Sequence, residues 1–226
     1  MPVGVGKHNG GMSTRAVDDG GPAAALNRFD PMVRDWFTAA FAEPTTAQAG
    51  AWDAIGKGDH TLVGAPTGSG KTLAAFLSAI DDLVSRADTT APAAQRCTVL
   101  YLSPLKALAV DVERNLRSPL NGIGAVAARA GVSAPQISVA VRSGDTPSGD
   151  LRAFARDGAD ILITTPESLF LLLTSRAREM LTGVRTVIID EVHAVAGTKR
   201  GAHLAVSLDR LDAFVDGVAD KRLTYA

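Results

Sequence analysis

Short apolar segments alternate with helical segments along most of this chain, and no other sequence feature constrains the fold as strongly. The apolar segments cover residues 61–65, 98–102, 137–141, 161–164 and 186–190, and most of them are continuous apolar runs. Continuous runs are typical of strands that are covered on both faces, as in a parallel sheet. The alternation therefore predicts an α/β fold with a mainly parallel sheet and helices on both faces.

The segments between these strands have helical periodicity. We expect helices over residues 71–86, 105–117, 147–157, 167–181 and 201–214. Two further helices should precede the first strand: one begins at Pro31 with Asp30 as its N-cap, and the other covers residues 45–56.

Glycine and small polar residues dominate the beginning of the chain and interrupt every periodicity there. We therefore expect residues 1–28 to be a flexible leader and residues 29–226 to form one domain. Residues 87–96 should form a surface loop, and residues 121–136, which are rich in Gly and Ala, a segment with a short helix at most.

Composition excludes several classes of protein. The 23 Lys and Arg residues and 24 Asp and Glu residues give a net charge of −1, so nucleic-acid binding would need a local groove instead of an overall positive field. Cys97 is the single cysteine, which rules out an internal disulfide and fits a reducing compartment such as the cytoplasm. No run of about 18 apolar residues is present, so we expect no membrane-spanning helix.

Residues 65–72 (APTGSGKT) follow the first predicted strand and open a helix, which is the context that a phosphate-binding loop requires. The glycines allow a sharp turn that directs backbone N–H groups at phosphate oxygens, and the helix N-terminus adds partial positive charge. Lys71 would reach the β- and γ-phosphates, and the Thr72 hydroxyl would ligate Mg²⁺. One departure is Ala65, where the general pattern has Gly. The candidate nucleotide-binding residues of this loop are Thr67, Gly68, Ser69, Gly70, Lys71 and Thr72.

A second candidate site, the acidic box, lies at the end of the last predicted strand. Residues 187–193 (VIIDEVH) are a hydrophobic strand followed by two carboxylates. Because the sites of parallel sheets lie at the carboxyl ends of their strands, Asp190 should face the phosphate loop and hold Mg²⁺, mainly through water. Glu191 would polarise the attacking water, and His193 could connect the nucleotide site to a neighbouring surface.

The phosphate loop and the acidic box together resemble those of superfamily 2 helicases of the DExH group. Further strings, at residues 108–116, 142–146 and 197–204, are similar to the Lhr (large helicase-related) family, and the resemblance covers about residues 34–211. It implies a RecA-like ATP-binding domain, ATP and Mg²⁺ as ligands, and a DNA-dependent ATPase that moves along single-stranded DNA. It also implies displacement of DNA or RNA strands, including RNA:DNA hybrids, and a link to DNA repair.

The resemblance also assigns candidate residues outside the two main motifs. Thr45 and Gln48 match the Q-motif, whose glutamine reads the adenine edge. Two motifs similar to helicase motifs Ia and Ib, and the string at residues 142–146, predict a nucleic-acid face. This face lies at or just past the ends of the strands, where backbone amides and hydroxyl groups can contact phosphates without recognising the bases. Its candidate residues are Ser103, Pro104, Lys106, Arg142, Gly144, Thr164 and Thr165.

The chain also departs from the family pattern. Motif III does not follow the last helix, and motifs IV to VI of a second RecA-like domain are absent, so we expect a domain truncated before motif III. Two hypotheses remain open. The first is the ATP-binding half of an Lhr-type motor, weakly active or inactive alone. The second is a non-motor fragment that binds nucleotide or nucleic acid without turnover. A small-molecule kinase would leave the Q-motif and motif Ia without a role.

Overall fold

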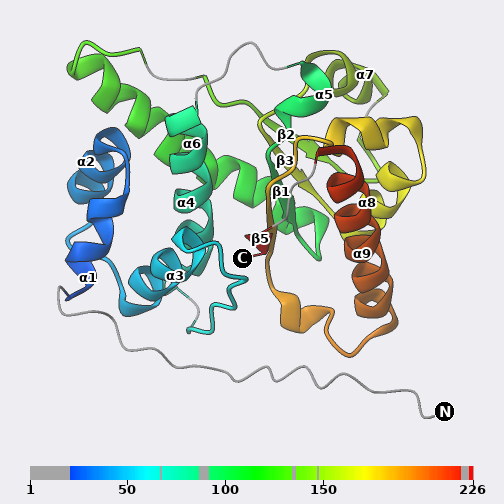
Figure 1. The fold of residues 1–226 in the computed structure, drawn as a ribbon, viewed down its shortest axis with the longest axis horizontal. Helices are drawn as coiled ribbons and strands as arrows, with labels where there is room; N and C mark the ends of the chain where they lie inside the picture. Colours follow the sequence, from blue (N-terminus) through cyan, green and yellow to red (C-terminus); the bar gives the residue numbers. More distant parts are fainter. Residues whose placement is uncertain are drawn as a thin grey trace.

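A parallel sheet forms the centre of the fold (Figure 1). The computed structural model describes residues 21–66, 68–86, 92–133, 136–146, 148–219 and 224–225. Its strands are β1 (Val99–Leu102), β2 (Val139–Arg142), β3 (Ile161–Thr164), β4 (Thr186–Ile189) and β5 (Thr224–Tyr225). They lie in the order β2-β3-β1-β4-β5, and every neighbouring pair is parallel.

Helices cover both faces of this sheet. The α-helices are α1 (Gly21–Ala24), α2 (Pro31–Ala40), α3 (Thr46–Gly56), α4 (Lys71–Arg86), α5 (Ala93–Arg96), α6 (Lys106–Arg129), α7 (Ser148–Asp157), α8 (Pro166–Leu173) and α9 (Lys199–Ala219). The 3₁₀ helices are η1 (Ala25–Arg28), η2 (Arg176–Leu181) and η3 (Val192–Ala194). Helices α2, α3, α4 and α6 lie on one side of the sheet, and α7, α8 and α9 lie on the other (Figure 1). The predicted fold class is therefore confirmed.

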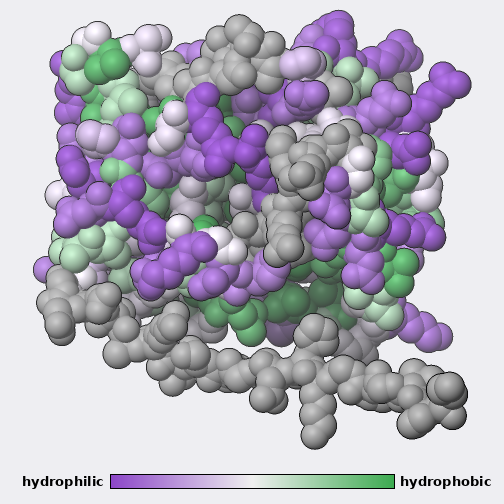
Figure 2. Space-filling view, in the orientation of Figure 1, coloured by the Kyte–Doolittle hydropathy of each residue, from purple (hydrophilic) through white to green (hydrophobic). Residues whose placement is uncertain are grey.

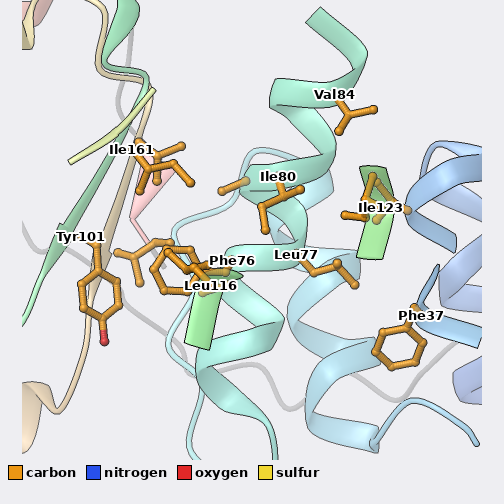
Figure 3. Close-up of a cluster of buried hydrophobic side chains, with 14 of the residues drawn as sticks. Phe37, Phe76, Leu77, Ile80, Val84, Tyr101, Leu116, Ile123 and Ile161 are labelled. Carbon is orange, nitrogen blue, oxygen red and sulfur yellow. The ribbon is translucent and has the colours of Figure 1, made fainter. Parts of the chain in front are cut away.

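Each face of the sheet has its own hydrophobic core, because successive strand residues point to opposite faces. On β1, Val99 and Tyr101 belong to the core with α4 and α6, whereas Leu100 and Leu102 belong to the core with α8 and α9. Figure 3 shows part of the first core, where side chains of α4 meet the sheet. Burying a large apolar side chain contributes about 1.5–3 kcal/mol, so two-sided burial is what selects β1 and β3 as central strands.

The outer surface agrees with this arrangement. Hydrophilic residues make up most of the face shown in Figure 2, as expected when the apolar sides of the helices are turned to the sheet. Among the described residues, no helix combines the length and the apolar character that crossing a membrane requires. Cys97 is buried, and burial raises the pKa of its thiol to about 12.

Local sequence signals explain the first helices. The Asp30 side chain accepts a hydrogen bond from the Met32 amide at 2.8 Å, and Pro31 occupies the first position of α2, as predicted. Helix α3 begins with a capping box. The Thr45 hydroxyl accepts from the Gln48 amide at 3.2 Å, and Gln48 Oε1 accepts from the Thr45 amide at 2.9 Å.

The prediction of a strand over residues 61–65 is wrong, because these residues form no β-ladder. A strand needs the backbone of a neighbour, which an apolar pattern by itself cannot supply. On the side of β4 away from β1, the neighbouring strand is β5, in which Thr224 pairs with Thr186 and Tyr225 with Val187. Residues 61–65 line a cavity beside the end of β4 instead.

Helix boundaries also differ from the sequence expectations. Helix α6 runs to Arg129, well beyond residue 117, since buried Leu116, Ile123 and Ala127 continue one face of it. The helix expected over residues 167–181 is divided into α8 and η2. Its break lies at Ser175, whose side chain accepts from the Ala177 amide and starts η2.

The expected leader needs a correction at its end. Residues 1–20 lie outside the described residues, but residues 21–28 form α1 and η1. Leu26 in η1 is buried in the core with α2 and α3, and its carbonyl accepts from the Phe29 amide at 3.1 Å. Burial of this one leucine explains why residues before 29 pack against the domain.

Candidate nucleotide-binding site and nucleic-acid face

The phosphate loop leads directly into α4. Gly68 and Gly70 have φ angles of +83° and +77°, which L-residues with side chains rarely adopt. A Cβ on Gly70 would lie 2.4 Å from Gln48 Nε2, the end of a side chain that can shift, so the backbone conformation is what requires glycine there. Thr67 lies outside the described residues.

Lys71 is held over this loop. Its ammonium donates to the carbonyl oxygen of Ala65 at 2.5 Å and to that of Pro66 at 3.0 Å. An ammonium has three donors, so one remains for a phosphate oxygen. Lys71 lies at the first turn of α4, and its contact with phosphate stays a prediction.

Thr45 and Gln48 meet the loop from the start of α3. The Thr45 hydroxyl donates to the Ser69 carbonyl and Gln48 Nε2 donates to the Gly70 carbonyl, both at 3.3 Å. Gln48 is only 5% exposed, and its Oε1 is engaged in the capping box. The structure thus brings this motif to the phosphate loop, while contact with adenine stays a prediction.

The acidic box follows β4 through a sharp turn. The Glu191 amide donates to Asp190 Oδ1 at 2.9 Å, and Glu191 has a left-handed backbone with φ +47° and ψ +39°. His193, in η3, is exposed and lies 3.1 Å from Glu191 through its Nε2. All three predicted side chains therefore gather at the carboxyl end of β4.

One cavity of about 670 Å³ joins the two motifs. It is lined by residues 60–66, by Lys71 and Thr72, by Tyr101, and by residues 188–193. A volume of this size is in the range of ligand pockets, and it lies at the carboxyl edge of a parallel sheet, where such sites occur.

The chemistry of this site fits a magnesium nucleotide. The Ser69 hydroxyl is buried and has no hydrogen-bond partner among the described residues, so the loop has an unused donor. The Thr72 hydroxyl and the Asp190 carboxylate line the same cavity. Hydroxyl and carboxylate oxygens suit Mg²⁺, which proteins hold with one or two carboxylates together with substrate phosphates.

The predicted nucleic-acid residues lie along the same edge but differ in accessibility. Ser103, Thr164 and Thr165 are at most 4% exposed, and Pro104 is buried as well. The Ser103 hydroxyl donates to the Leu105 carbonyl at 2.9 Å, and the Thr164 hydroxyl donates to the Arg142 carbonyl at 2.7 Å.

These hydroxyl groups are engaged inside the chain. The Thr165 hydroxyl likewise caps α8 by accepting from the Ser168 amide. Contacts of Ser103, Thr164 and Thr165 to a nucleic-acid strand therefore stay predictions, and in this structure their hydroxyl groups serve caps and turns.

Three candidates remain accessible on this face. Lys106 is exposed and pairs with Asp145, and Gly144 is exposed beside it. Arg142, at the end of β2, is half-buried, and this desolvation lowers the pKa of its guanidinium. Their contacts to nucleic acid stay predictions.

Sequence reasoning missed Tyr101, which the structure places at the acidic box, and left Arg200 open between a DNA contact and an ordinary surface residue. Tyr101 in β1 donates a hydrogen bond from its hydroxyl to Asp190 Oδ2. Arg200 in α9 donates to Glu167 Oε1 at 2.7 Å and to the Pro104 carbonyl at 2.9 Å. The one available signal for Tyr101 was a phenol within an otherwise aliphatic strand.

Comparisons with known proteins agree with this geometry. A family model described as DEAD/DEAH box helicase matches residues 45–224. The chain is 65% identical over 199 residues to a Lhr helicase/probable uracil glycosylase of Mycolicibacterium smegmatis, covering 88% of this chain and 13% of that protein. It is 53% identical to the Lhr helicase/uracil glycosylase of Escherichia coli, covering 91% of this chain and 14% of that protein.

Solved structures show the same fold. The Mycobacterium smegmatis helicase Lhr bound to ssDNA and AMP-PNP matches with a TM-score of 0.81 and 63% identity, over 89% of this chain and 25% of that one. The DEAD-box helicase Mss116, bound to ssRNA and UDP-BeF, matches with a TM-score of 0.70 at 18% identity, which supports the RecA-like fold alone. This chain thus spans a small part of the length of the relatives it matches.

Proposed function

We propose that this chain, which belongs to the DEAD/DEAH box helicase family, is the ATP-binding RecA-like domain of a nucleic-acid motor of the Lhr type. The single observation that supports this most strongly is the shared cavity, which has the phosphate loop on one side and the acidic box on the other. The longer protein would couple ATP hydrolysis to movement along single-stranded DNA and to strand displacement.

The residues around the cavity divide the chemistry among them. The loop amides and Lys71 would bind the β- and γ-phosphates, and Glu191 would orient the attacking water and accept its proton. Thr72 and Asp190 would hold Mg²⁺, which neutralises charge on the phosphates when bound. Gln48 would meet the adenine from the start of α3, next to the loop that it already contacts.

Single-stranded DNA is the proposed partner of the face that carries Lys106, Arg142 and Gly144. The net charge of −1 supplies no general attraction for DNA, so a local set of cations and backbone amides must provide it. An RNA:DNA hybrid is a further proposed substrate of the longer protein.

We expect slow turnover by this chain alone. In related NTPases an arginine from a neighbouring domain stabilises the transition state by a factor of about 10³–10⁵. A second RecA-like domain is the proposed source of that arginine, since the curated relatives are much longer than this chain. Nucleotide binding, in contrast, needs only residues of this chain, several of which line the cavity.

Calorimetry with Mg²⁺ and AMP-PNP tests the proposal. Lys71→Ala should weaken binding at least about tenfold, because it removes a charged hydrogen bond to phosphate. Lys57→Ala is the matched control, since Lys57 is an exposed lysine that pairs with Asp53 at the end of α3. Absence of binding by the unmodified chain would contradict the proposed function. Binding without any turnover, even with single-stranded DNA and longer versions of the protein, would favour a non-motor fragment.

A further inference from the structure

Tyr101 sends the only polar atom of its side chain out of an apolar strand toward the acidic box. The residue is fully buried on β1, where its neighbours Val99, Leu100 and Leu102 are aliphatic. Figure 3 shows the hydroxyl pointing away from the cluster of apolar side chains. The acceptor of this hydroxyl is Asp190 Oδ2, at the end of the adjacent strand β4.

The ring of Tyr101 is held from the other side by the helix of the phosphate loop. Phe76 stacks on it with a centroid distance of 4.9 Å and an angle of 23° between the rings. Phe76 lies on α4, about one turn beyond Thr72. Tyr101 is therefore a physical link between the loop helix and Asp190.

The Asp190 carboxylate is restrained at both oxygens. Oδ2 accepts from Tyr101, and Oδ1 accepts from the Glu191 amide at 2.9 Å. Two donors on different oxygens fix the plane of the carboxylate, yet each oxygen keeps a further lone pair. The open lone pairs belong to a group that lines the cavity with Thr72.

The hydroxyl of Tyr101 is the part of this side chain that core packing does not explain. An apolar strand gains nothing from a buried hydroxyl as such, because phenylalanine would fill the same space without a group to satisfy.

We propose that Tyr101 is a positioning residue, whose hydroxyl holds the Asp190 carboxylate in the orientation that takes up the magnesium ion of a bound magnesium nucleotide. This inference rests on the proposed function of the cavity. It assigns a role in metal-nucleotide binding to a residue of β1, the strand that precedes the predicted nucleic-acid segment at residues 103–108.

The test measures the affinity for AMP-PNP as a function of Mg²⁺ concentration, from EDTA to saturation. Tyr101→Phe removes only the hydroxyl and keeps the stacked ring. We expect its metal-free affinity to stay within about twofold of the unmodified chain, while the half-saturating Mg²⁺ concentration rises about tenfold, as for a lost hydrogen bond to a charged group. Ser207→Ala is the matched control, because it removes a buried hydroxyl that donates to the His203 carbonyl within α9.

A second variant separates the hydroxyl from the ring. Phe76→Leu keeps the phenol but removes its stacking partner, so we expect a smaller rise in the half-saturating Mg²⁺ concentration. Thermal denaturation of each variant checks that it is folded.

The outcomes are distinct. A Tyr101→Phe chain with unchanged Mg²⁺ dependence overturns the inference, as does an equal loss of affinity with and without Mg²⁺, which would mean a purely structural role. If the unmodified chain binds AMP-PNP under no condition, the proposed function fails and the inference fails with it.

Discussion

Glu191 is the one non-glycine residue with a positive φ among the described residues, and it is also the proposed activator of water. A left-handed backbone costs an L-residue about 1–2 kcal/mol, and such strain concentrates at functional sites. Here the turn aims the Asp190 carboxylate back at the Glu191 amide and starts η3. The strained turn thus lowers the stability of the folded chain but positions the carboxylates of Asp190 and Glu191.

Replacing Glu191 should expose this trade-off. Glu191→Gly relieves the backbone strain, so we expect the free energy of unfolding to rise by about 1 kcal/mol, measured by urea denaturation. Glu191→Gln keeps the strain and should leave stability within about 0.5 kcal/mol of the original. Both variants should lose ATP hydrolysis in the longer protein. Equal stabilities for the two variants would contradict the strain argument.

At the scale of elements, α2 is joined to α4 through one carboxylate. Asp81 of α4 accepts a hydrogen bond at 2.6 Å from the amide of Asp30, the N-cap of α2. Burial raises the pKa of Asp81 to about 6; the carboxylates of Asp30 and Asp82 add to the rise, while the Asp30 amide and Arg28 oppose it. The hydrogen bond thus joins two helices and favours the Asp81 carboxylate, but the burial of that carboxylate disfavours its charge more strongly.

This pKa predicts a pH-dependent stability. The folded chain holds the Asp81 proton more tightly than the unfolded chain, whose pKa is about 3.9. The penalty is therefore complete above pH 6 and disappears as the pH falls toward 4. Asp81→Asn should raise the free energy of unfolding at pH 7.5 by about 1 kcal/mol, after discounting for partial exposure, and by nothing at about pH 4.

Urea denaturation across this pH range measures the effect. Asp82→Asn is the matched control, because the neighbouring Asp82 forms an exposed ion pair with Arg86 and should change stability little at any pH. A stability gain from Asp81→Asn that is equal at both pH values would contradict the assignment.

A close approach of two backbones sets the connection from η2 to β4. A Cβ on Gly183 would lie 2.0 Å from the Gln95 carbonyl oxygen and 3.0 Å from that of Cys97. We expect Gly183→Ala to lower the free energy of unfolding by about 2 kcal/mol or more, since backbone atoms must move. Gly217→Ala is the control: it faces open space in α9 and should stabilise by about 0.5–1 kcal/mol. Calorimetric melting of both variants decides this.

At the scale of the whole molecule, Arg200 ties together three segments that follow different strands. It joins the start of α9 to Glu167 in the first turn of α8 and to the Pro104 carbonyl after β1. The Arg200 guanidinium holds the pKa of Glu167 below its usual range. Two of these segments, those after β1 and β3, carry residues of the predicted nucleic-acid face, and we expect their relative placement to depend on the brace that Arg200 forms.

Removing the brace should weaken binding of single-stranded DNA without affecting the nucleotide site. Arg200→Ala removes the hydrogen bonds to Glu167 and to the Pro104 carbonyl, which on a partly exposed surface contribute about 1 kcal/mol. We expect the affinity for a labelled oligonucleotide, measured by fluorescence anisotropy, to fall about fivefold. Lys199→Ala removes the same charge at the neighbouring position and is the matched control. If both variants lose affinity equally, charge alone accounts for the effect and the brace does not.

Features that depend on local rules could be predicted from the sequence. Continuous apolar runs predicted β1 and β3 as strands covered on both faces, and Gly68 and Gly70 predicted a sharp turn, where both have a positive φ. The sequence also predicted the Asp30 cap of α2, because capping involves only neighbouring residues. It predicted that the phosphate loop and the acidic box meet at one edge of the sheet, because the carboxyl ends of parallel strands lie at the same edge.

Contacts between groups far apart in the sequence could not be predicted and follow from the packing of the whole fold. It left residues 61–65 unpaired, turned the Ser103 and Thr164 hydroxyls inward, and brought Tyr101 to Asp190, which is 89 residues away. The reason is physical: a strand exists only beside a partner, and a buried hydroxyl takes whichever acceptor packing places next to it. Neither the partner nor the acceptor is written into the local pattern of residues.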